Sequence, residues 1–236
     1  MLQRFRLDWR IGLAYVLGGT AGCHPSVAPL LPTGLGPVTP EQVARWVAAT
    51  TPQRAVLHRF TWLYQDEQAS KGGRGSVRIT PGDSLRIDFA VSLGIGKGSA
   101  VVVGDSALWI VPERSLDDLV PGAALLWAVL GVAQPPRPGD RLAGLESEGR
   151  AAWRYVRDGD TVSYLRVSAS PPVLYAEVRR DGQVLGLAEL RARDDGTPLK
   201  AKLTVPRVPS KLEISFYATV PTDSFPRATW APPAQP

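Results

Sequence analysis

Residues 84–96 of the chain, SLRIDFAVSLGIG, decide the fold class. Leu85, Ile87 and Phe89 alternate with polar residues, which is the period of a β-strand that has one buried face. Pro81-Gly82-Asp83 marks a turn before this run, and an apolar segment flanked by glycines follows it. The stretch therefore predicts a regular strand of an antiparallel sheet that ends in an apolar loop.

The same two-residue period recurs along most of the chain. Asp158-Gly159 and Asp181-Gly182 are hairpin signals between such runs, and few intervening segments are long enough for the helical crossover of a parallel sheet. The predicted fold class is mainly β with α, a curved antiparallel sheet of about eleven strands that forms a half-barrel. The strand runs are expected at residues 56–64, 75–79, 85–91, 100–103, 107–111, 141–145, 152–157, 162–167, 173–179, 184–192, 199–205 and 212–216.

Two short helices accompany the strands. Thr39-Pro40-Glu41 is a helix start, with a hydroxyl cap, a proline in the first turn and an early acid. Val43, Trp46 and Val47 then form an apolar stripe at helical spacing. A second helical piece is expected at residues 123–130 (AALLWAVL), an apolar insertion between strands.

The composition narrows the function classes. The 236 residues are 44% hydrophobic and 21% charged, which is typical of a folded chain with one sizeable core. One Cys excludes an internal disulfide, and two His with one Cys give no basis for a metal site. The net charge of +5 is too moderate to indicate nucleic acid. His58 lies in mid-strand with no nucleophile-elbow motif in the sequence, so we predict no enzyme and no cofactor.

The amino terminus has the features of a bacterial lipoprotein signal. Three arginines precede the short apolar run at residues 11–19, and Ala21-Gly22 leads directly into Cys23. Cys23 is therefore the expected lipidation site, carrying acyl groups such as palmitate that anchor the protein to a membrane. His24, in place of Asp, favours the outer membrane by resemblance to enterobacterial sorting signals. The alternative is an ordinary secretory signal in which the Cys falls by chance.

The order of these elements resembles the LolA/LolB-like family of bacterial periplasmic lipoprotein carriers and outer-membrane receptors. The resemblance covers roughly residues 40–220 and depends on the strand and loop at 84–96, the hairpin through Trp109 and the insertion at 125–131 (LLWAVLG). It implies a curved antiparallel sheet closed by the N-terminal helix and the helical insertion. It also implies a concave apolar face that binds acyl chains and, in the receptor, a protruding hydrophobic loop.

With this resemblance the chain divides into four parts. They are a signal peptide (1–22), a lipid anchor with a Pro/Gly-rich tether (23–38), a LolA/LolB-like half-barrel domain (39–220) and a Pro-rich C-terminal tail (221–236). The tether has an alternative interpretation as a strand-like arm packed on the domain.

Large apolar side chains of the predicted strands and insertion are the candidates for an acyl-chain cavity. Each methylene that leaves water gains about 0.8 kcal/mol, so the wall of such a cavity must be dry and apolar. The alternative is that the same side chains simply fill a core beneath the helices. The candidates are Phe60, Trp62, Leu85, Ile87, Phe89, Trp109 and Trp127.

The loop after the 84–91 strand is the candidate membrane-facing loop. Leu93 and Ile95 stand between glycines, and Lys97 follows them at a position suited to anionic lipid head groups. By analogy with the family's receptor loop, Leu93 is expected to insert into the membrane surface or to guide acyl transfer. The alternative is a buried hairpin tip.

The predicted function is a membrane-anchored lipoprotein of the cell envelope that faces the periplasm from the outer membrane. It would bind lipid or lipoprotein acyl chains in an apolar half-barrel, in lipoprotein localisation, with a periplasmic carrier protein as a further partner. The alternative is a structural or assembly lipoprotein that binds another envelope protein.

Overall fold

One curved antiparallel sheet of thirteen strands forms the body of the computed structural model, which describes residues 34–92, 96–112 and 120–232. The predicted fold class is confirmed, with thirteen strands in place of about eleven. The strands are β1 (Gly36–Pro37), β2 (Ala55–Gln65), β3 (Ser70–Ile79), β4 (Ser84–Val91), β5 (Lys97–Val103), β6 (Ser106–Val111), β7 (Arg141–Ser147), β8 (Arg150–Arg157), β9 (Asp160–Val167), β10 (Val173–Arg180), β11 (Gln183–Ala192), β12 (Pro198–Val205) and β13 (Ser210–Thr222).

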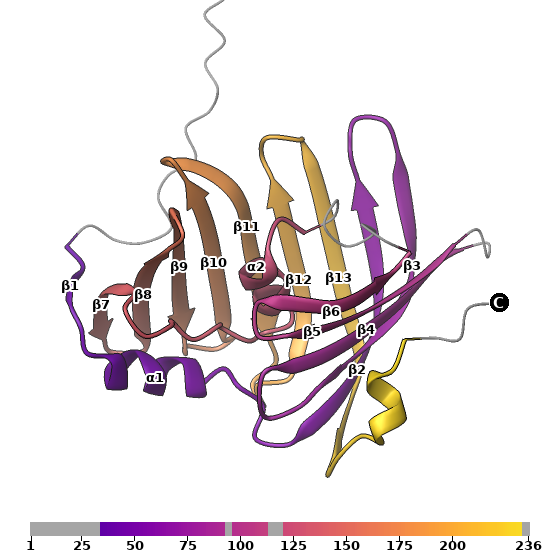
Figure 1. Ribbon diagram of the computed structural model, residues 1–236, viewed down its shortest axis with the longest axis horizontal. Helices are drawn as coiled ribbons and strands as arrows, with labels where there is room; N and C mark the ends of the chain where they lie inside the picture. Colours follow the sequence, from indigo (N-terminus) through magenta and orange to yellow (C-terminus); the bar gives the residue numbers. More distant parts are fainter. Residues whose placement is uncertain (1–33, 93–95, 113–119, 233–236) are drawn as a thin grey trace, which may run out of the picture.

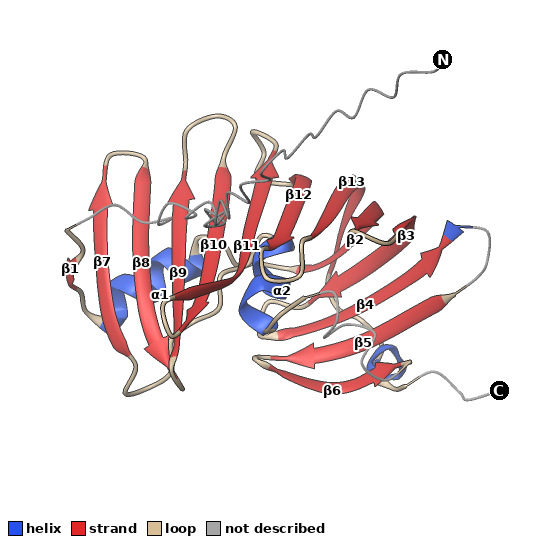
Figure 2. Ribbon diagram, turned by 90° about the horizontal axis from the view of Figure 1, so that it is seen from above, coloured by secondary structure: helices blue, strands red, loops and turns tan. Residues whose placement is uncertain are grey.

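The sheet consists of two meanders that meet where the last strand pairs with the first long one. Figures 1 and 2 show β2–β6 on one side and β7–β13 on the other, in the order β1-β7-β8-β9-β10-β11-β12-β13-β2-β3-β4-β5-β6. Pairing of β13 with β2 runs from Lys211 opposite Gln65 to Thr222 opposite Ala55. Strands β1 and β6 are the two edges, so the described sheet is an open half-barrel.

The predicted hairpin turns form at both Asp-Gly pairs. Asp158 and Asp181 have φ values of 49° and 50°, and the glycines that follow them also have positive φ. Two successive residues in the left-handed region are the conformation of a type I′ turn, which matches the twist of the strands that it joins. These turns connect β8 to β9 and β10 to β11.

Helix α1 (Pro40–Ala48) begins at the predicted cap. Thr39 accepts a hydrogen bond from the backbone N–H of Gln42, and the Gln42 side chain accepts one from the N–H of Thr39 at 2.9 Å. The apolar stripe is buried, and Trp46 packs on Trp153 of β8 with ring centroids 5.9 Å apart. The helix therefore covers the end of the sheet that β7–β9 form, as Figure 1 shows.

Helix α2 (Ala123–Val129) lies inside the curve of the sheet, against β10, β11 and β12 (Figure 2). Its Trp127 donates from Nε1 to the carbonyl oxygen of Gly104 at 2.7 Å, which ties the helix to the turn between β5 and β6. Gly131, with φ of 90°, follows the last turn. Within the described ranges, no helix has the length and apolarity needed to cross a membrane.

Short elements lie at the two ends of the folded part. Residues 36–37 pair with β7, as a strand-like arm would. Strand β13 continues past residue 220 to Thr222, and a short 3-10 helix (Arg227–Trp230) follows it.

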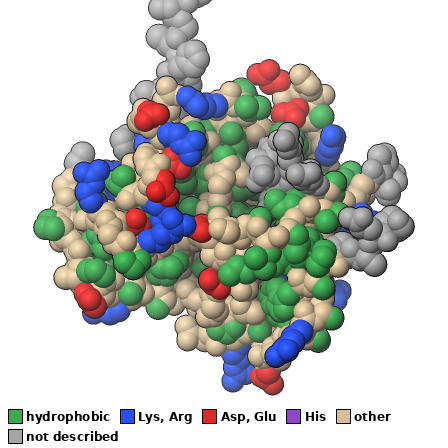
Figure 3. All heavy atoms as spheres, viewed as in Figure 1, with side chains coloured by type: hydrophobic (Ala, Val, Ile, Leu, Met, Phe, Trp, Pro, Cys, Tyr) green, Lys and Arg blue, Asp and Glu red, His purple; other side chains and the backbone are tan. Residues whose placement is uncertain are grey.

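At the β6 edge Leu108 is 64% exposed, and Figure 3 shows hydrophobic side chains gathered on this side of the molecule.

Candidate functional site

The concave face carries a small cavity whose described lining is wholly apolar. Its volume is about 40 Å³, enough for a water-sized group. One wall is the sheet around the β13–β2 junction, and the other is α2 with the residues beside it. The lining residues are Phe60, Trp62, Ile87, Phe89, Leu212 and Ile214 from the sheet and Val120, Leu126, Val129 and Leu130 from the helix side.

Glycines on the neighbouring strands make room for the aromatic rings of this wall. Phe60 of β2, Gly75 of β3, Phe89 of β4 and Gly98 of β5 lie side by side in one row across the sheet. A Cβ at Gly75 would lie 2.5 Å from two atoms of the Phe60 ring, and one at Gly98 would lie 2.3 Å from Cζ of Phe89. Each ring therefore lies over the glycine beside it, which leaves space above the rings.

Trp62 brings an unpartnered hydrogen-bond donor to the same wall. Its indole packs edge-on to Phe89, with centroids 6.1 Å apart and an interplanar angle of 86°. The Nε1 atom is buried and has no hydrogen-bond partner among the described residues. A buried N–H without a partner costs about 1–3 kcal/mol, so an acceptor oxygen of a ligand at this wall would recover part of that cost.

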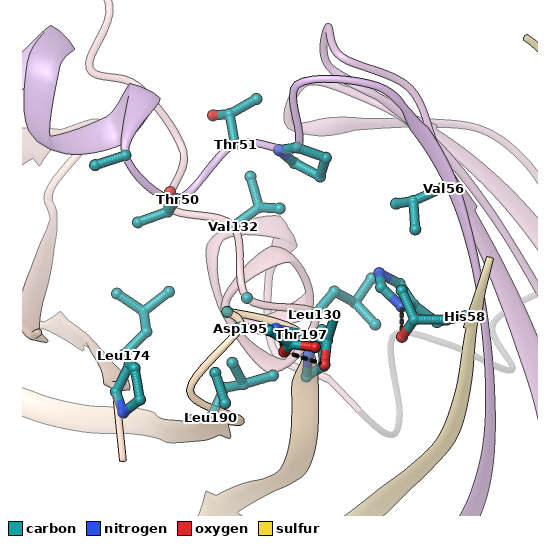
Figure 4. Close-up of a pocket in the computed structure, with 18 of the residues that line it drawn as sticks. Thr50, Thr51, Val56, His58, Leu130, Val132, Leu174, Leu190, Asp195 and Thr197 are labelled. Atoms are coloured by element: carbon teal, nitrogen blue, oxygen red, sulfur yellow. Dashed lines mark hydrogen bonds between the residues drawn. The ribbon is translucent and has the colours of Figure 1, made fainter. Parts of the chain in front are cut away.

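A larger cavity of about 560 Å³ adjoins the apolar one, and Leu130 lines both. Its volume lies within the range of small-molecule sites, about 300–1,000 Å³. Figure 4 shows Leu174 and Leu190 on one side, Val56 and His58 on the other and the end of α2 between them. The residues from Ala49 to Val56, which lead from α1 into β2, contribute the remaining side.

The polar groups of the larger cavity differ in charge and pairing. His58 shares a 2.9 Å hydrogen bond between its Nδ1 and the hydroxyl of Thr219, and burial lowers its pKa from 6.5 to about 4, so the ring is neutral near pH 7. Asp195 accepts hydrogen bonds from the N–H and the hydroxyl of Thr197 at 2.8 and 2.6 Å, which lower its pKa. Arg166 supplies positive charge from β9.

Four of the seven predicted cavity residues line the apolar cavity. They are Phe60, Trp62, Ile87 and Phe89. Leu85 is fully buried in the core that continues from this wall, and Trp127 is buried where it anchors α2 to Gly104.

Trp109 was predicted for the concave face, and the structure corrects this placement. It pairs with Val101 and lies over the guanidinium of Arg86 on the convex face, 5.4 Å from the ring centroid. Its Nε1 donates to the carbonyl oxygen of Trp230 at 3.0 Å. A bulge at Leu108 shifts the alternation of β6 by one residue, so Ala107 and Trp109 face opposite sides.

The predicted loop and anchor lie mostly outside the described residues. Leu93, Ile95 and Cys23 belong to ranges 93–95 and 1–33, which the structure does not describe. Lys97 is exposed as the first residue of β5 and pairs with Ala90. Across residues 34–92, 96–112 and 120–232, no group of three or more His, Cys, Asp or Glu side chains could hold a metal ion.

Four residues of the site were not predicted from the sequence. Leu212 and Ile214 were predicted to lie in a strand. Their position beside Trp62 depends on the pairing of β13 with β2, which are far apart in the sequence. Gly98 and Arg166 were not singled out. The alternation of β9 does place Arg166 on the same face as buried Val162 and Tyr164, which was the available signal.

Comparison with known proteins identifies the fold. No protein-family model and no curated protein sequence matches the chain. Among solved structures, an outer-membrane lipoprotein-sorting protein domain of Vibrio parahaemolyticus is 9% identical, with a TM-score of 0.50 over 81% of this chain and 97% of that chain. A LolA-superfamily protein of Nitrosomonas europaea is 11% identical, with a TM-score of 0.38 over 83% of this chain and 98% of the other.

A third solved structure is the MucA/MucB complex of Pseudomonas aeruginosa. It is 16% identical, with a TM-score of 0.34 over 82% of this chain and 60% of that chain. The match to the lipoprotein-sorting domain, together with the open sheet and the helices inside its curve, shows that the chain has a LolA/LolB-like fold.

Proposed function

We propose that this protein binds acyl chains of lipids or lipoproteins on its concave face, as a lipoprotein of the cell envelope that faces the periplasm. The two adjoining cavities on the concave face carry this proposal, because the larger one has the volume of a small-molecule site and every described residue that lines the smaller one beside α2 is apolar. The similarity to a lipoprotein-sorting domain agrees with a periplasmic binding role in lipoprotein localisation.

The two adjoining cavities suggest how a chain would lie. The apolar cavity of about 40 Å³ is too small for an acyl chain, whereas the larger one of about 560 Å³ has apolar walls at Leu174, Leu190 and Val132. We infer that a chain enters through the larger cavity and passes Leu130, which lines both. Each methylene buried along this path would contribute about 0.8 kcal/mol.

Lipid extraction from the purified full chain tests the proposal. The protein is extracted from membranes, and bound lipids are analysed by native mass spectrometry and organic extraction. Ile214→Phe adds volume inside the apolar cavity, whereas Val220→Phe adds the same ring at a side chain that is 50% exposed on the same strand. We expect co-purifying acyl lipid in the unmodified protein and in V220F, and a reduced amount in I214F. Lipid-free protein, or equal lipid in the two variants, would contradict the proposal.

The membrane anchor is a separate part of the proposal. Cys23 follows a signal-like segment, and residues 24–33 would tether the domain to the membrane. Labelled palmitate should enter the full chain and should not enter Cys23→Ser, which should also leave the membrane fraction. Retention of C23S in that fraction would show that something other than the thiol anchors the protein. In this arrangement the segment from Leu93 to Lys97 is the candidate membrane-facing loop.

A second candidate function is a structural or assembly lipoprotein that binds another envelope protein. The observation in its favour is the edge strand β6, whose outer side pairs with no described strand and whose Leu108 and Val111 are 64% and 36% exposed. Native mass spectrometry separates the two functions, because a lipid-free chain that retains a protein partner would favour assembly.

A further inference from the structure

Arg166 lies in an otherwise apolar row of the concave face. On β9 it follows Val162 and Tyr164, both buried, on the inward side of the strand. The residues opposite it on the neighbouring strands are Ala151 of β8 and Leu174 of β10, both in the hydrophobic core. A guanidinium at this place brings a permanent positive charge to the wall of the larger cavity.

Arg166 lacks both the counter-ion that Arg157 and Arg179 have and the hydrogen-bond acceptors that Arg154 and Arg193 have among the described residues. Its Nε is buried without a hydrogen-bond partner, and it forms no ion pair with a described residue. By contrast Arg157 pairs with Asp105 and Asp140 at 3.2 Å, and Arg179 pairs with Glu177 at 2.6 Å. A guanidinium Nε that is buried without a partner costs free energy unless something else supplies an acceptor.

The other titratable groups of the cavity do not fill that role. Asp195 is the one described acidic residue in the lining, and its carboxylate is already bound by Thr197. His58 is turned to Thr219 and is neutral near pH 7. Arg54, an exposed residue of the loop before β2, adds a second cation to the lining. The described lining therefore carries two arginines and one acid.

We propose that Arg166 binds the anionic head group, a carboxylate or a phosphate, of an amphiphile whose acyl chain lies along Leu174, Leu190 and Leu130. This inference rests on the proposed acyl-chain binding and adds the chemical class of the ligand. A planar guanidinium matches both anions with two parallel N–H···O hydrogen bonds. The apolar side chains next to it continue toward the apolar cavity, so the head group stays at the larger opening and the chain points inward.

The test compares ligands that share one chain and differ in the head group. The full chain is loaded with N-phenyl-1-naphthylamine, a neutral fluorescent probe for apolar sites, and the probe is displaced with laurate, lauroyl lysophosphatidate or dodecanol. We expect both anions, or one of them, to bind at least about tenfold more tightly than the alcohol, as charge-assisted hydrogen bonds would give. The two anion arms separate a carboxylate ligand from a phosphate ligand, and inorganic phosphate alone shows whether the head group suffices.

Arg166→Gln removes the charge and should bring the anions to within about twofold of dodecanol, whose own affinity stays unchanged. Arg166→Lys keeps the charge and should retain part of the preference. Arg59→Gln is the matched control, because Arg59 is exposed on the convex face of β2. The preference of R59Q for anions should equal that of the unmodified chain.

The outcomes separate this inference from the function on which it rests. If the unmodified chain binds laurate, lysophosphatidate and dodecanol equally, the head-group site is refuted while acyl-chain binding stands. If neither the probe nor any of the three ligands binds, the proposed function itself fails. If R166Q loses dodecanol as strongly as the anions, Arg166 acts through the fold rather than through a head group, which also overturns the inference.

Discussion

Gly98→Ala should push the Phe89 ring into the apolar cavity. An added Cβ would lie 2.3, 2.8 and 2.9 Å from three atoms of that ring, whereas ordinary contacts begin near 3.4 Å. The ring must therefore move by about 1 Å, and the space above it is the cavity of about 40 Å³. Overpacking of this kind costs about 1–3 kcal/mol, and replacing glycine returns about 0.5–1 kcal/mol. The expected net loss is about 1–2 kcal/mol, with weaker acyl-probe binding.

Urea unfolding followed by tryptophan fluorescence measures the loss of stability, and probe titration measures the loss of binding. Gly82→Ala is the matched control, because its Cβ would have no atom within 4 Å. Phe89→Leu in the G98A background should relieve the overlap, so the two substitutions should not be additive. If G98A is as stable as G82A and binds the probe equally well, the ring does not depend on the glycine and our account of the cavity wall is wrong.

Three further predictions concern pH, a paired indole and the undescribed loop. Burial lowers the pKa of His58 from 6.5 to about 4. Between pH 6.5 and pH 4 the unfolded chain therefore binds a proton at His58 that the native chain does not bind. The free energy of unfolding should fall by about 3 kcal/mol over this pH range because of His58. Urea unfolding should show this component disappear in His58→Asn, and an unchanged pH dependence would contradict it. Trp127→Phe should lower the free energy of unfolding by about 1–2 kcal/mol more than Trp62→Phe does. The reason is that Trp127 Nε1 has an acceptor, whereas Trp62 Nε1 has none among the described residues. Equal losses of stability in the same assay would argue against this. Leu93→Glu should leave the unfolding transition unchanged and slow lipid transfer between vesicles, and transfer at the normal rate would count against a role for the loop.

The strands and turns were predictable because their signals are local. The alternation from Leu85 to Phe89 sets one buried face, and Asp158-Gly159 supplies the left-handed conformations that a tight hairpin needs. Thr39 likewise specifies the start of α1 through its own hydroxyl. The side of the sheet that Trp109 faces could not be predicted from the local sequence. The bulge at Leu108 reverses the side on which the later residues of β6 point, and the alternation of residue types does not reveal it.

The site was only partly predictable because it depends on pairing across the chain. Ile214 lies opposite Trp62 only when β13 pairs with β2, two strands that are far apart in the sequence. The position of α2 inside the curve then decides which apolar side chains line a hollow and which fill the core. The sequence shows that Phe60 and Phe89 are inward-facing, but the space above them follows from the glycines beside them on other strands.

The pattern of unpartnered donors bears on the choice between a lipid carrier and a scaffold. Trp62 Nε1 lies at the wall of the apolar cavity and Arg166 Nε at the wall of the larger one, and each lacks a partner among the described residues. Trp153 Nε1 and Tyr155 OH are also buried without a partner, at a cost of about 1–3 kcal/mol each, but neither residue lines these two cavities. The head group of the proposed amphiphile would satisfy Arg166, and its chain would pass Leu130 toward the apolar cavity. The unpartnered Nε of Arg166 at the cavity wall therefore favours a bound amphiphile over a protein partner at the sheet edge.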